Sequence, residues 1–155
     1  MFSVNPPGAG HVAMLLGELL DTTRSAFHEH EWGGLRPSHL RVLSAVPEVG
    51  CTVTELAGRV GMTKQGCGQF VTALVDNGQL AEGRAVDDRR VRLVTRTPAG
   101  DATLIRFAAV MAGLEQRWRD AVGQQRYAAF RAVLEELAAD PSTPEAGSAA
   151  GSRHG

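Results

Sequence analysis

The sequence predicts a mainly α domain of the α+β class, with six helices and one short β-hairpin. Apolar residues recur at helical spacing in five stretches, and a capping pattern marks the start of a sixth helix. Two segments compatible with β-strands, residues 80–86 and 91–97, flank the sequence DDRR, which would form the tip of a hairpin. A chain of 155 residues is long enough for one domain with a substantial core.

Glycine and proline bound the first two helices. Residues 1–10 are rich in both and are expected to form a flexible N-terminus. A helix is expected from Val12 to about His30, and a Gly-Gly pair then stops it. The second helix should begin at Pro37, because proline is tolerated in the first turn of a helix, and should end before Pro47.

A helix-turn-helix is predicted in the middle of the chain. Thr52 and Glu55 fit the capping-box pattern, in which each side chain accepts a hydrogen bond from the other residue's backbone N–H at a helix start. This short helix runs to about Val60. After a tight Gly-Met connection, Thr63 can cap the next helix, which ends at an Asn-Gly pair. Two helices joined by a short glycine-containing turn make the motif.

Two more helices are predicted after the hairpin. Thr97 is a good cap and is followed by a proline suited to the first turn, so a long helix should begin there and end at Gly123. A last helix follows, with apolar residues at alternating three- and four-residue steps. Residues 140–155 have the composition of a disordered tail.

The charges are unevenly distributed along the chain. The formal net charge is -1, which gives no general attraction to polyanions. Residues 36–96, however, hold nine basic and six acidic residues. Any case for binding nucleic acid therefore rests on where these charges lie.

Cysteine content and hydropathy exclude several classes of protein. The two cysteines, Cys51 and Cys67, have no paired spacing, so neither a disulfide framework nor a four-cysteine metal site is expected. No apolar stretch approaches the length of a membrane span, and the N-terminus lacks the pattern of an export signal. We expect a cytoplasmic protein with no membrane partner.

The helix predicted to begin at Thr63 has one apolar and one polar face. The polar face carries Lys64, Gln65, Gly68, Gln69, Thr72 and Asp76. Such groups can hydrogen-bond base edges or phosphates from a helix in a major groove, and a glycine there lets the backbone approach a partner. A solvated surface has the same pattern, so the residues alone leave both interpretations open.

The hairpin tip carries a second candidate contact. Asp88 stands two residues before Arg90, close enough to orient its guanidinium across a tight turn, while Arg89 can reach outward. An arginine on a projecting tip suits a narrow minor groove, where the negative potential is strongest. The alternative is a surface ion pair worth about 0–1 kcal/mol.

Three motifs occur in order: LRPSHLRVL at the second helix, TVTELAGRVGMTKQ in the helix-turn-helix, and DDRRVRLVTRTPAG at the hairpin. Together they resemble the MarR family of winged-helix transcriptional regulators. The resemblance implies a winged helix-turn-helix with N- and C-terminal dimerisation helices. Residues 35–97 would form the DNA-binding region and residues 11–34 and 98–139 the dimerisation helices, all within one domain.

The resemblance also implies a function. The protein would be a homodimer that binds double-stranded DNA at a pseudo-palindromic operator, a repressor released by a small-molecule effector or another signal. The candidate DNA-binding residues are Thr63, Lys64, Gln65, Gly68, Gln69, Thr72, Asp88, Arg89 and Arg90. Net acidity and the glycines of the reading helix keep one alternative open, a winged helix that has lost specific DNA binding and serves protein interaction.

Two further groups of residues are candidates for dimerisation and for effector binding. The dimerisation candidates are Leu15, Leu19, Met111, Leu114, Trp118, Tyr127, Phe130, Leu134 and Leu137. A helix buried within one chain has a similar apolar stripe. The resemblance implies a ligand cleft between the dimer helices and the winged region, and Phe27, His28, Trp32 and His39 are candidates to line it, although aromatic residues there also serve packing.

Catalytic and metal sites are not expected. His28 and His30 hold alternate positions on a helix and point apart, so they do not share one ion by themselves. Cys67 falls on the inner face of its helix, whereas Cys51 precedes a helix; whether either senses oxidation is left open. The sequence has no nucleophile and base with meaningful spacing and no phosphate loop, so neither an enzyme nor a cofactor is expected.

Overall fold

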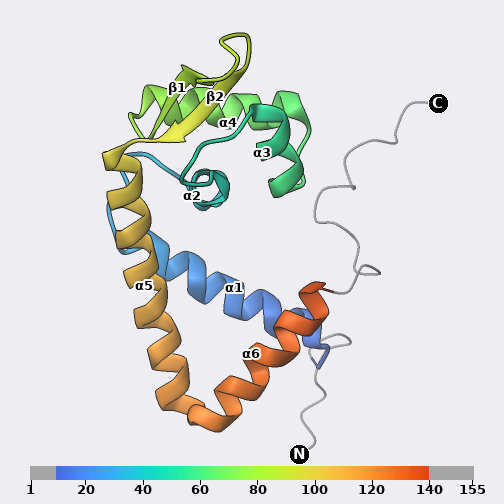
Figure 1. Ribbon diagram of the computed structural model, residues 1–155. Coiled ribbons are helices and arrows are strands. Elements are labelled where there is room, and N and C mark those ends of the chain that lie inside the picture. Colours follow the sequence, from blue (N-terminus) through green and yellow to red (C-terminus); the bar gives the residue numbers. More distant parts are fainter. Residues whose placement is uncertain (1–9, 140–155) are drawn as a thin grey trace, which may run out of the picture.

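We analysed a computed structural model of the protein, which describes residues 10–139 (Figure 1). This part of the chain forms six helices and one β-hairpin. In chain order these are α1 (Val12–His28), α2 (Pro37–Ala45), α3 (Val53–Val60), α4 (Lys64–Asp76), β1 (Leu80–Arg84), β2 (Arg92–Arg96), α5 (Pro98–Val122) and α6 (Gln124–Ala139). The predicted tail, residues 140–155, and all but the last residue of the predicted N-terminal segment lie outside the described residues.

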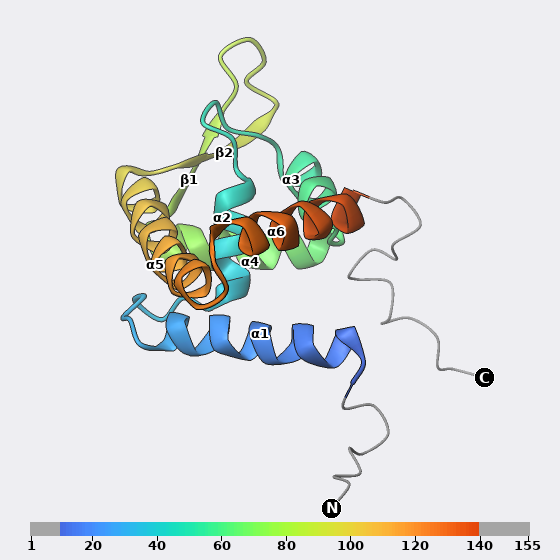
Figure 2. The ribbon, with the colours of Figure 1, turned by 90° about the horizontal axis from the view of Figure 1, so that it is seen from below.

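The elements form two regions that α5 connects. We call residues 37–96, which hold α2, α3, α4 and both strands, the winged-helix unit, and α1, α5 and α6 the helical base. In Figure 1 α5 runs down from the winged-helix unit, and α1 and α6 extend from it toward the same side. Figure 2 shows these two arms separated from one another. The predicted mainly helical fold with one antiparallel hairpin is confirmed.

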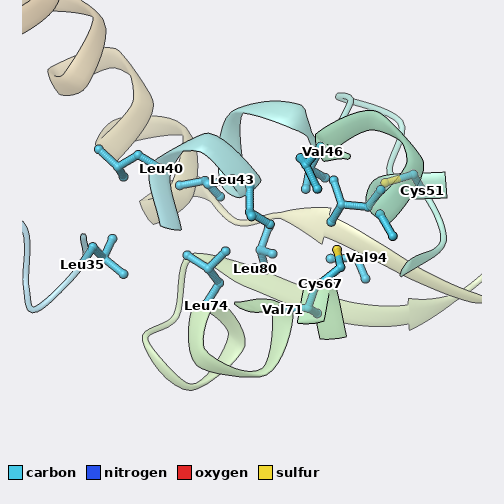
Figure 3. Close-up of a cluster of buried hydrophobic side chains, with 14 of the residues drawn as sticks. Leu35, Leu40, Leu43, Val46, Cys51, Cys67, Val71, Leu74, Leu80 and Val94 are labelled. Atoms are coloured by element: carbon cyan, nitrogen blue, oxygen red, sulfur yellow. The ribbon is translucent and has the colours of Figure 1, made fainter. Parts of the chain in front are cut away.

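One apolar cluster holds the winged-helix unit together (Figure 3). Every helix and strand of the unit contributes a side chain to it. Its fully buried members include Leu40, Leu43, Leu56, Leu74, Leu80 and Val94. Burying one such aliphatic side chain contributes about 1.5–3 kcal/mol of transfer free energy. The same cluster includes Phe27, Trp32 and Leu35, which precede the unit, and it fixes the hairpin against the three helices.

Local capping sets the ends of the helix-turn-helix as predicted. Thr52 N–H donates to the Glu55 carboxylate at 2.8 Å, and Glu55 N–H donates to the Thr52 hydroxyl at 3.2 Å. Gly61 ends α3 with a positive φ of 63°, a conformation that favours glycine. The Thr63 hydroxyl then accepts a hydrogen bond from Gly66 N–H at 3.1 Å and begins α4.

The backbone just before α3 pairs with the hairpin beyond the hairpin's own ladder. Leu80 pairs with Arg96 at its base and Arg84 with Arg92 toward its tip. Cys51, just before α3, exchanges two backbone hydrogen bonds with Val94 of β2, at 3.0 and 2.8 Å. These bonds hold the outer edge of β2 against the start of α3.

Several predicted boundaries differ by a few residues. Helix α1 ends at His28, not at about His30, because the backbone leaves the helix at Glu29. The strands are Leu80–Arg84 and Arg92–Arg96, shorter than predicted, because residues 85–91 form the loop at the tip. None of the helices between residues 10 and 139 has the length and apolar character needed to cross a membrane.

The start of α5 is packed directly onto the backbone that follows α4. The Thr97 hydroxyl accepts from Gly100 N–H at 3.1 Å and lies 2.6 Å from the Gly78 carbonyl oxygen, to which it donates. Gly100 is buried, and a Cβ built on it would overlap the Gln79 carbonyl oxygen. Only glycine allows this close approach.

Gly100→Ala is therefore expected to destabilise the fold by about 1–3 kcal/mol, since backbone on both sides must move to admit the methyl group. Gly58→Ala is the matched control: it also lies inside a helix but has open space around it, so alanine should be neutral or stabilise the protein by up to about 1 kcal/mol. Denaturant unfolding measures both. Equal stability of the two variants would contradict the packing described.

Candidate nucleic-acid interface

Helix α4 separates its residues as the sequence predicts. Cys67, Val71 and Leu74 are buried in the core of the winged-helix unit. Lys64 and Gln65 are exposed in the first turn, and Gln69 and Thr72 follow on the exposed side. The Thr72 hydroxyl donates to the Gly68 carbonyl at 3.0 Å, so it is turned back onto its own helix. The exposed amides and ammonium group of α4 are thus concentrated in its first two turns.

The side chains of Thr63 and Asp88 accept hydrogen bonds from backbone N–H groups. Thr63 is the N-cap of α4. The Asp88 carboxylate accepts a hydrogen bond from the backbone N–H of Arg90 at 2.9 Å, and Val91 N–H donates to the Asp88 carbonyl at 3.0 Å. Among the ion pairs of residues 10–139, none joins Asp88 to Arg90. This corrects the expectation that Asp88 orients the guanidinium: its carboxylate shapes the turn at the tip.

A groove brings together the start of α3, the start of α4 and the part of the hairpin from the tip loop to the middle of β2. We call it the wing groove; its volume is about 790 Å³. It is lined by Thr52, Val53, Thr54, Lys64, Gln65, Gly68, Glu82, Arg90, Val91, Arg92, Leu93 and Val94. Of the predicted site residues, Lys64, Gln65, Gly68 and Arg90 share this groove, whereas Thr63, Gln69, Thr72, Asp88 and Arg89 do not line it.

Four polar residues of the groove were missed by the sequence analysis: Thr52, Thr54, Glu82 and Arg92. For Arg92 and Glu82, the pairing of the two strands shows why they line the groove. Arg92 and buried Val94 are two residues apart in β2, so their side chains lie on the same face of the strand. This face points toward the helices. Glu82 lies opposite Val94 in the ladder and so belongs to the same face.

The groove is predominantly cationic with one acidic group. Lys64 and Arg90 approach from the helix and from the tip, Arg92 lies on the strand between them, and Glu82 is the carboxylate. Cations attract the phosphate backbone of a duplex, and amide and guanidinium groups can pair with base edges. A carboxylate accepts from the exocyclic amine of cytosine. The arrangement therefore suits a duplex better than a small anion.

Comparison with known proteins gives a clear result only for structures. No protein-family model and no curated protein matches the sequence. The repressor CouR, solved bound to a 23-mer DNA duplex, is 24% identical, with a TM-score of 0.70 over 88% of this chain and 99% of that chain. The regulator PcaV from Streptomyces coelicolor, solved with its natural ligand, is 22% identical, with a TM-score of 0.67 over 89% and 97%.

FabT from Streptococcus pneumoniae, solved with DNA, is 12% identical, with a TM-score of 0.70 over 82% of this chain and 90% of that chain. The matches span nearly the whole of each regulator, helical base included. The chain has the MarR-type winged-helix fold. The resemblance inferred from the three motifs is thus confirmed at the level of the fold.

Within this fold, the four residues suggested for an effector cleft do not line one cavity together. The rings of Phe27 and Trp32 are buried and stacked 5.0 Å apart, and Trp32 Nε1 donates to the Phe27 carbonyl at 2.7 Å. His28 is exposed. His39 accepts from Arg36 N–H at 3.0 Å and packs edge-on against Phe70. Burial, followed by the nearby Arg36 charge, lowers the pKa of His39.

A different cavity lies between α1 and α5. Its volume is about 450 Å³, and Ala26, Val110 and Leu114 contribute apolar lining. Arg106 and Arg117 of α5 add two guanidinium groups, and Glu29 and His30 also line the cavity, so it combines apolar surface with two cationic groups and one carboxylate. Arg106 also lies over the Trp32 ring, 4.7 Å from its centroid, and donates to the Glu31 carbonyl at 2.8 Å.

The predicted dimerisation residues fall into two groups. Leu114 and Tyr127 are buried within the chain, and Leu19, Met111 and Trp118 are half-buried. Leu15, Phe130, Leu134 and Leu137 are exposed on the two arms of the helical base. Val12, Met14 and Leu20 of α1 and Val133 of α6 are also exposed. The arms therefore carry far more apolar surface than the winged-helix unit.

Residues 10–139 contain no cluster of three or more potential metal ligands. Both thiols, Cys51 and Cys67, are reduced and buried in the core cluster. Burial, the dominant cause, raises the pKa of each thiol above its usual value. A buried thiol with a raised pKa is a poor nucleophile.

The native protein is accordingly expected to react slowly with a disulfide reagent such as Ellman's reagent. Below the raised pKa values, the small thiolate fraction grows about tenfold per pH unit, so labelling should accelerate as the pH rises toward and beyond 9. The same chain unfolded in denaturant is the control, and it should label at least tenfold faster at pH 8. Equal rates in the two states would show that a thiol is accessible.

Proposed function

We propose that this protein is a DNA-binding transcriptional regulator, a homodimeric repressor that binds a pseudo-palindromic operator. The observation that carries the proposal is the wing groove, where Lys64 and Gln65 of α4 face Arg90 and Arg92 of the hairpin. A helix in the major groove and an arginine at the adjacent minor groove read DNA from two directions. The fold shared with regulators solved on DNA supports the proposal. No catalytic role is proposed.

The exposed apolar arms support the dimer. Exposed apolar surface often marks an interaction site, and each arm carries several exposed apolar side chains. The arms also border an apolar cavity of about 300 Å³ lined by Leu19, Trp118, Val122, Tyr127 and Phe130 among others, which a side chain of a second copy can fill. A two-fold dimer matches two half-sites about one helical turn apart.

Release of the operator would follow from a shift between two dimer geometries. A small molecule that binds one geometry better than the other shifts the population by its difference in affinity. The cavity between α1 and α5 is the candidate site, and its two arginines, Arg106 and Arg117, outnumber its one carboxylate, Glu29, which favours an anionic compound. Among proteins of similar fold, BpsR from Bordetella bronchiseptica is described as regulated in DNA binding by 6-hydroxynicotinic acid, which supports this form of control.

Alanine at Gln65 or Arg90 should weaken binding to a selected operator by about 5- to 150-fold each, because a lost base-reading contact costs about 1–3 kcal/mol. Fluorescence anisotropy on duplexes selected from random sequence measures this. Arg24→Ala is the matched control: it removes an exposed arginine from α1, far from the groove, and should leave affinity unchanged. A purified protein that selects no duplex would favour the alternative, a winged helix used for protein interaction.

Charged residues on the arms should break the dimer. Leu15→Glu and Leu134→Glu place carboxylates at positions 50% and 37% exposed in the single chain, and a second copy would bury both. Sedimentation equilibrium should give the monomer mass for each variant and the dimer mass for the native protein. Val49→Glu, an 85% exposed apolar residue between α2 and α3, is the control and should stay dimeric. A monomeric native protein would refute the dimer.

A further inference from the structure

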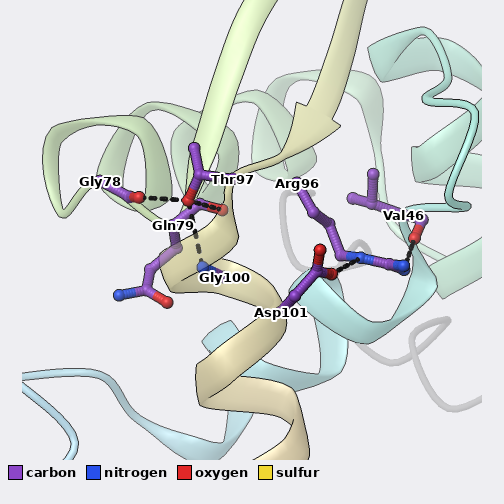
Figure 4. A network of polar contacts seen from close by, with 7 residues as sticks. All are labelled: Val46, Gly78, Gln79, Arg96, Thr97, Gly100 and Asp101. Atoms are coloured by element: carbon purple, nitrogen blue, oxygen red, sulfur yellow. Dashed lines mark hydrogen bonds and ion pairs between the residues drawn. The ribbon is translucent and has the colours of Figure 1, made fainter.

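Arg96, the last residue of β2, bridges two other segments at the junction of the two regions (Figure 4). Its Nε donates to the Asp101 carboxylate at 2.6 Å. Its Nη1 donates to the carbonyl oxygen of Val46, the residue that ends α2. The Arg96 side chain is 21% exposed and that of Asp101 is 53% exposed, so water competes less for the bond to Val46 than for the bond to Asp101.

The bridge joins the winged-helix unit to the long helix of the base. Asp101 lies in the first turn of α5, whereas Val46 and Arg96 belong to the winged-helix unit. Helix α5 packs against α2 and β2 near its start and against α1 and α6 farther along. The angle at which α5 leaves the winged-helix unit therefore sets where that unit lies relative to the base.

One attachment point would leave this angle poorly defined. Thr97 and Gly100 hold the start of α5 against Gly78 and Gln79. A helix fixed only there can still tilt about its first turn, and Leu104, Phe107 and Val110 farther along α5 restrain it by non-directional apolar packing. In Figure 4 the Arg96 bridge lies on the other side of that turn, toward α2. Two points on opposite sides of the helix axis restrict the tilt.

We propose that Arg96 is a positioning residue for operator binding: by bridging Val46 and Asp101 it fixes the angle between the winged-helix unit and α5. In the dimer this angle determines the separation of the two reading helices, and thereby which half-site spacing the protein accepts. The proposal rests on the proposed function. Neither Arg96 nor Asp101 lines the wing groove, so neither is assigned a contact with bases.

The test is a series of duplexes that differ only in half-site spacing, bound by native protein and by Arg96→Met. Adding or removing two base pairs rotates one half-site by about 70° and moves it by about 7 Å. We expect native affinity to fall about tenfold or more at such spacings and the variant to change by less than about threefold. We call the plot of affinity against half-site spacing the spacing profile. Loss of one positive charge lowers affinity equally at every spacing, whereas loss of the bridge changes the shape of this profile.

Arg41→Met is the matched control. Arg41 donates to the Val60 carbonyl at 2.8 Å, so it also links a guanidinium to a helix-end carbonyl, but both partners lie inside the winged-helix unit. This variant should keep the native spacing profile. Asp101→Asn removes the ionic partner of Arg96 and keeps the shape of the side chain. It should broaden the spacing profile as Arg96→Met does. Agreement between the two variants shows that the effect does not come from a folding defect in Arg96→Met. Native profiles in both bridge variants would overturn the proposal.

A second measurement needs neither DNA nor a dimer. Spin labels on Asp76→Cys in α4 and Ala112→Cys in α5 report the distance between the unit and the base by pulsed electron resonance, since buried Cys51 and Cys67 do not label. Labelled chains diluted with unlabelled chains give the distance within one chain. Arg96→Met should widen the distance distribution and Arg41→Met should not; equal widths would overturn the proposal. If the native protein does not bind DNA, the proposed function is refuted. The distance distributions would still decide whether Arg96 fixes the angle between the winged-helix unit and α5.

Discussion

Burial of one shared apolar cluster is the constraint on which the winged-helix unit depends. Leu43 of α2, Leu74 of α4 and Val94 of β2 are all fully excluded from water, so no element can shift without exposing the others. The hairpin has two strands and would be marginal alone. Its register is fixed because the face that carries Leu80 and Val94 must point into the cluster.

The position of the polar groups follows from that burial. Once Val94 points inward, Arg92 two residues earlier lies on the same side of the strand and lines the groove beside Lys64. Once Cys67 and Val71 are buried, Gln65 must project outward at the start of α4. The groove is therefore the outer edge of the core, and its geometry is as rigid as the packing behind it.

Features that depend on neighbouring residues could be predicted from the sequence. The Thr52–Glu55 capping box and the Thr63 cap involve residues three positions apart, so their pattern is local and the structure has both. The membership of the groove was only partly predictable. Thr54 and Arg92 are separated along the chain and meet only because β2 pairs with Cys51 before α3. No sequence window contains that contact.

The aromatic residues show a second limit of sequence patterns. Phe27 and Trp32 were candidates for a ligand cleft because aromatic rings line both cavities and cores, and composition does not separate the two. Their stacking, with Phe107 edge-on to Trp32, makes them a core at the end of α1. Asp88 is a similar case: a carboxylate two residues from an arginine can bond either its guanidinium or its backbone, and the turn geometry selects the backbone.

The two regions differ in how completely each buries its own apolar surface. The winged-helix unit buries its apolar side chains in one cluster with Phe27, Trp32 and Leu35, whereas the arms of the base leave leucine and phenylalanine side chains in water. Because exposed apolar surface often marks an interaction site, the base is the region where a partner is expected to bind. The base contacts the winged-helix unit through α5 and through the buried rings of Phe27 and Trp32, and next to these rings Arg106 of α5 donates to the Glu31 carbonyl. Because the cavity between α1 and α5 also contains Arg106, a ligand bound there would act directly on one of these two connections.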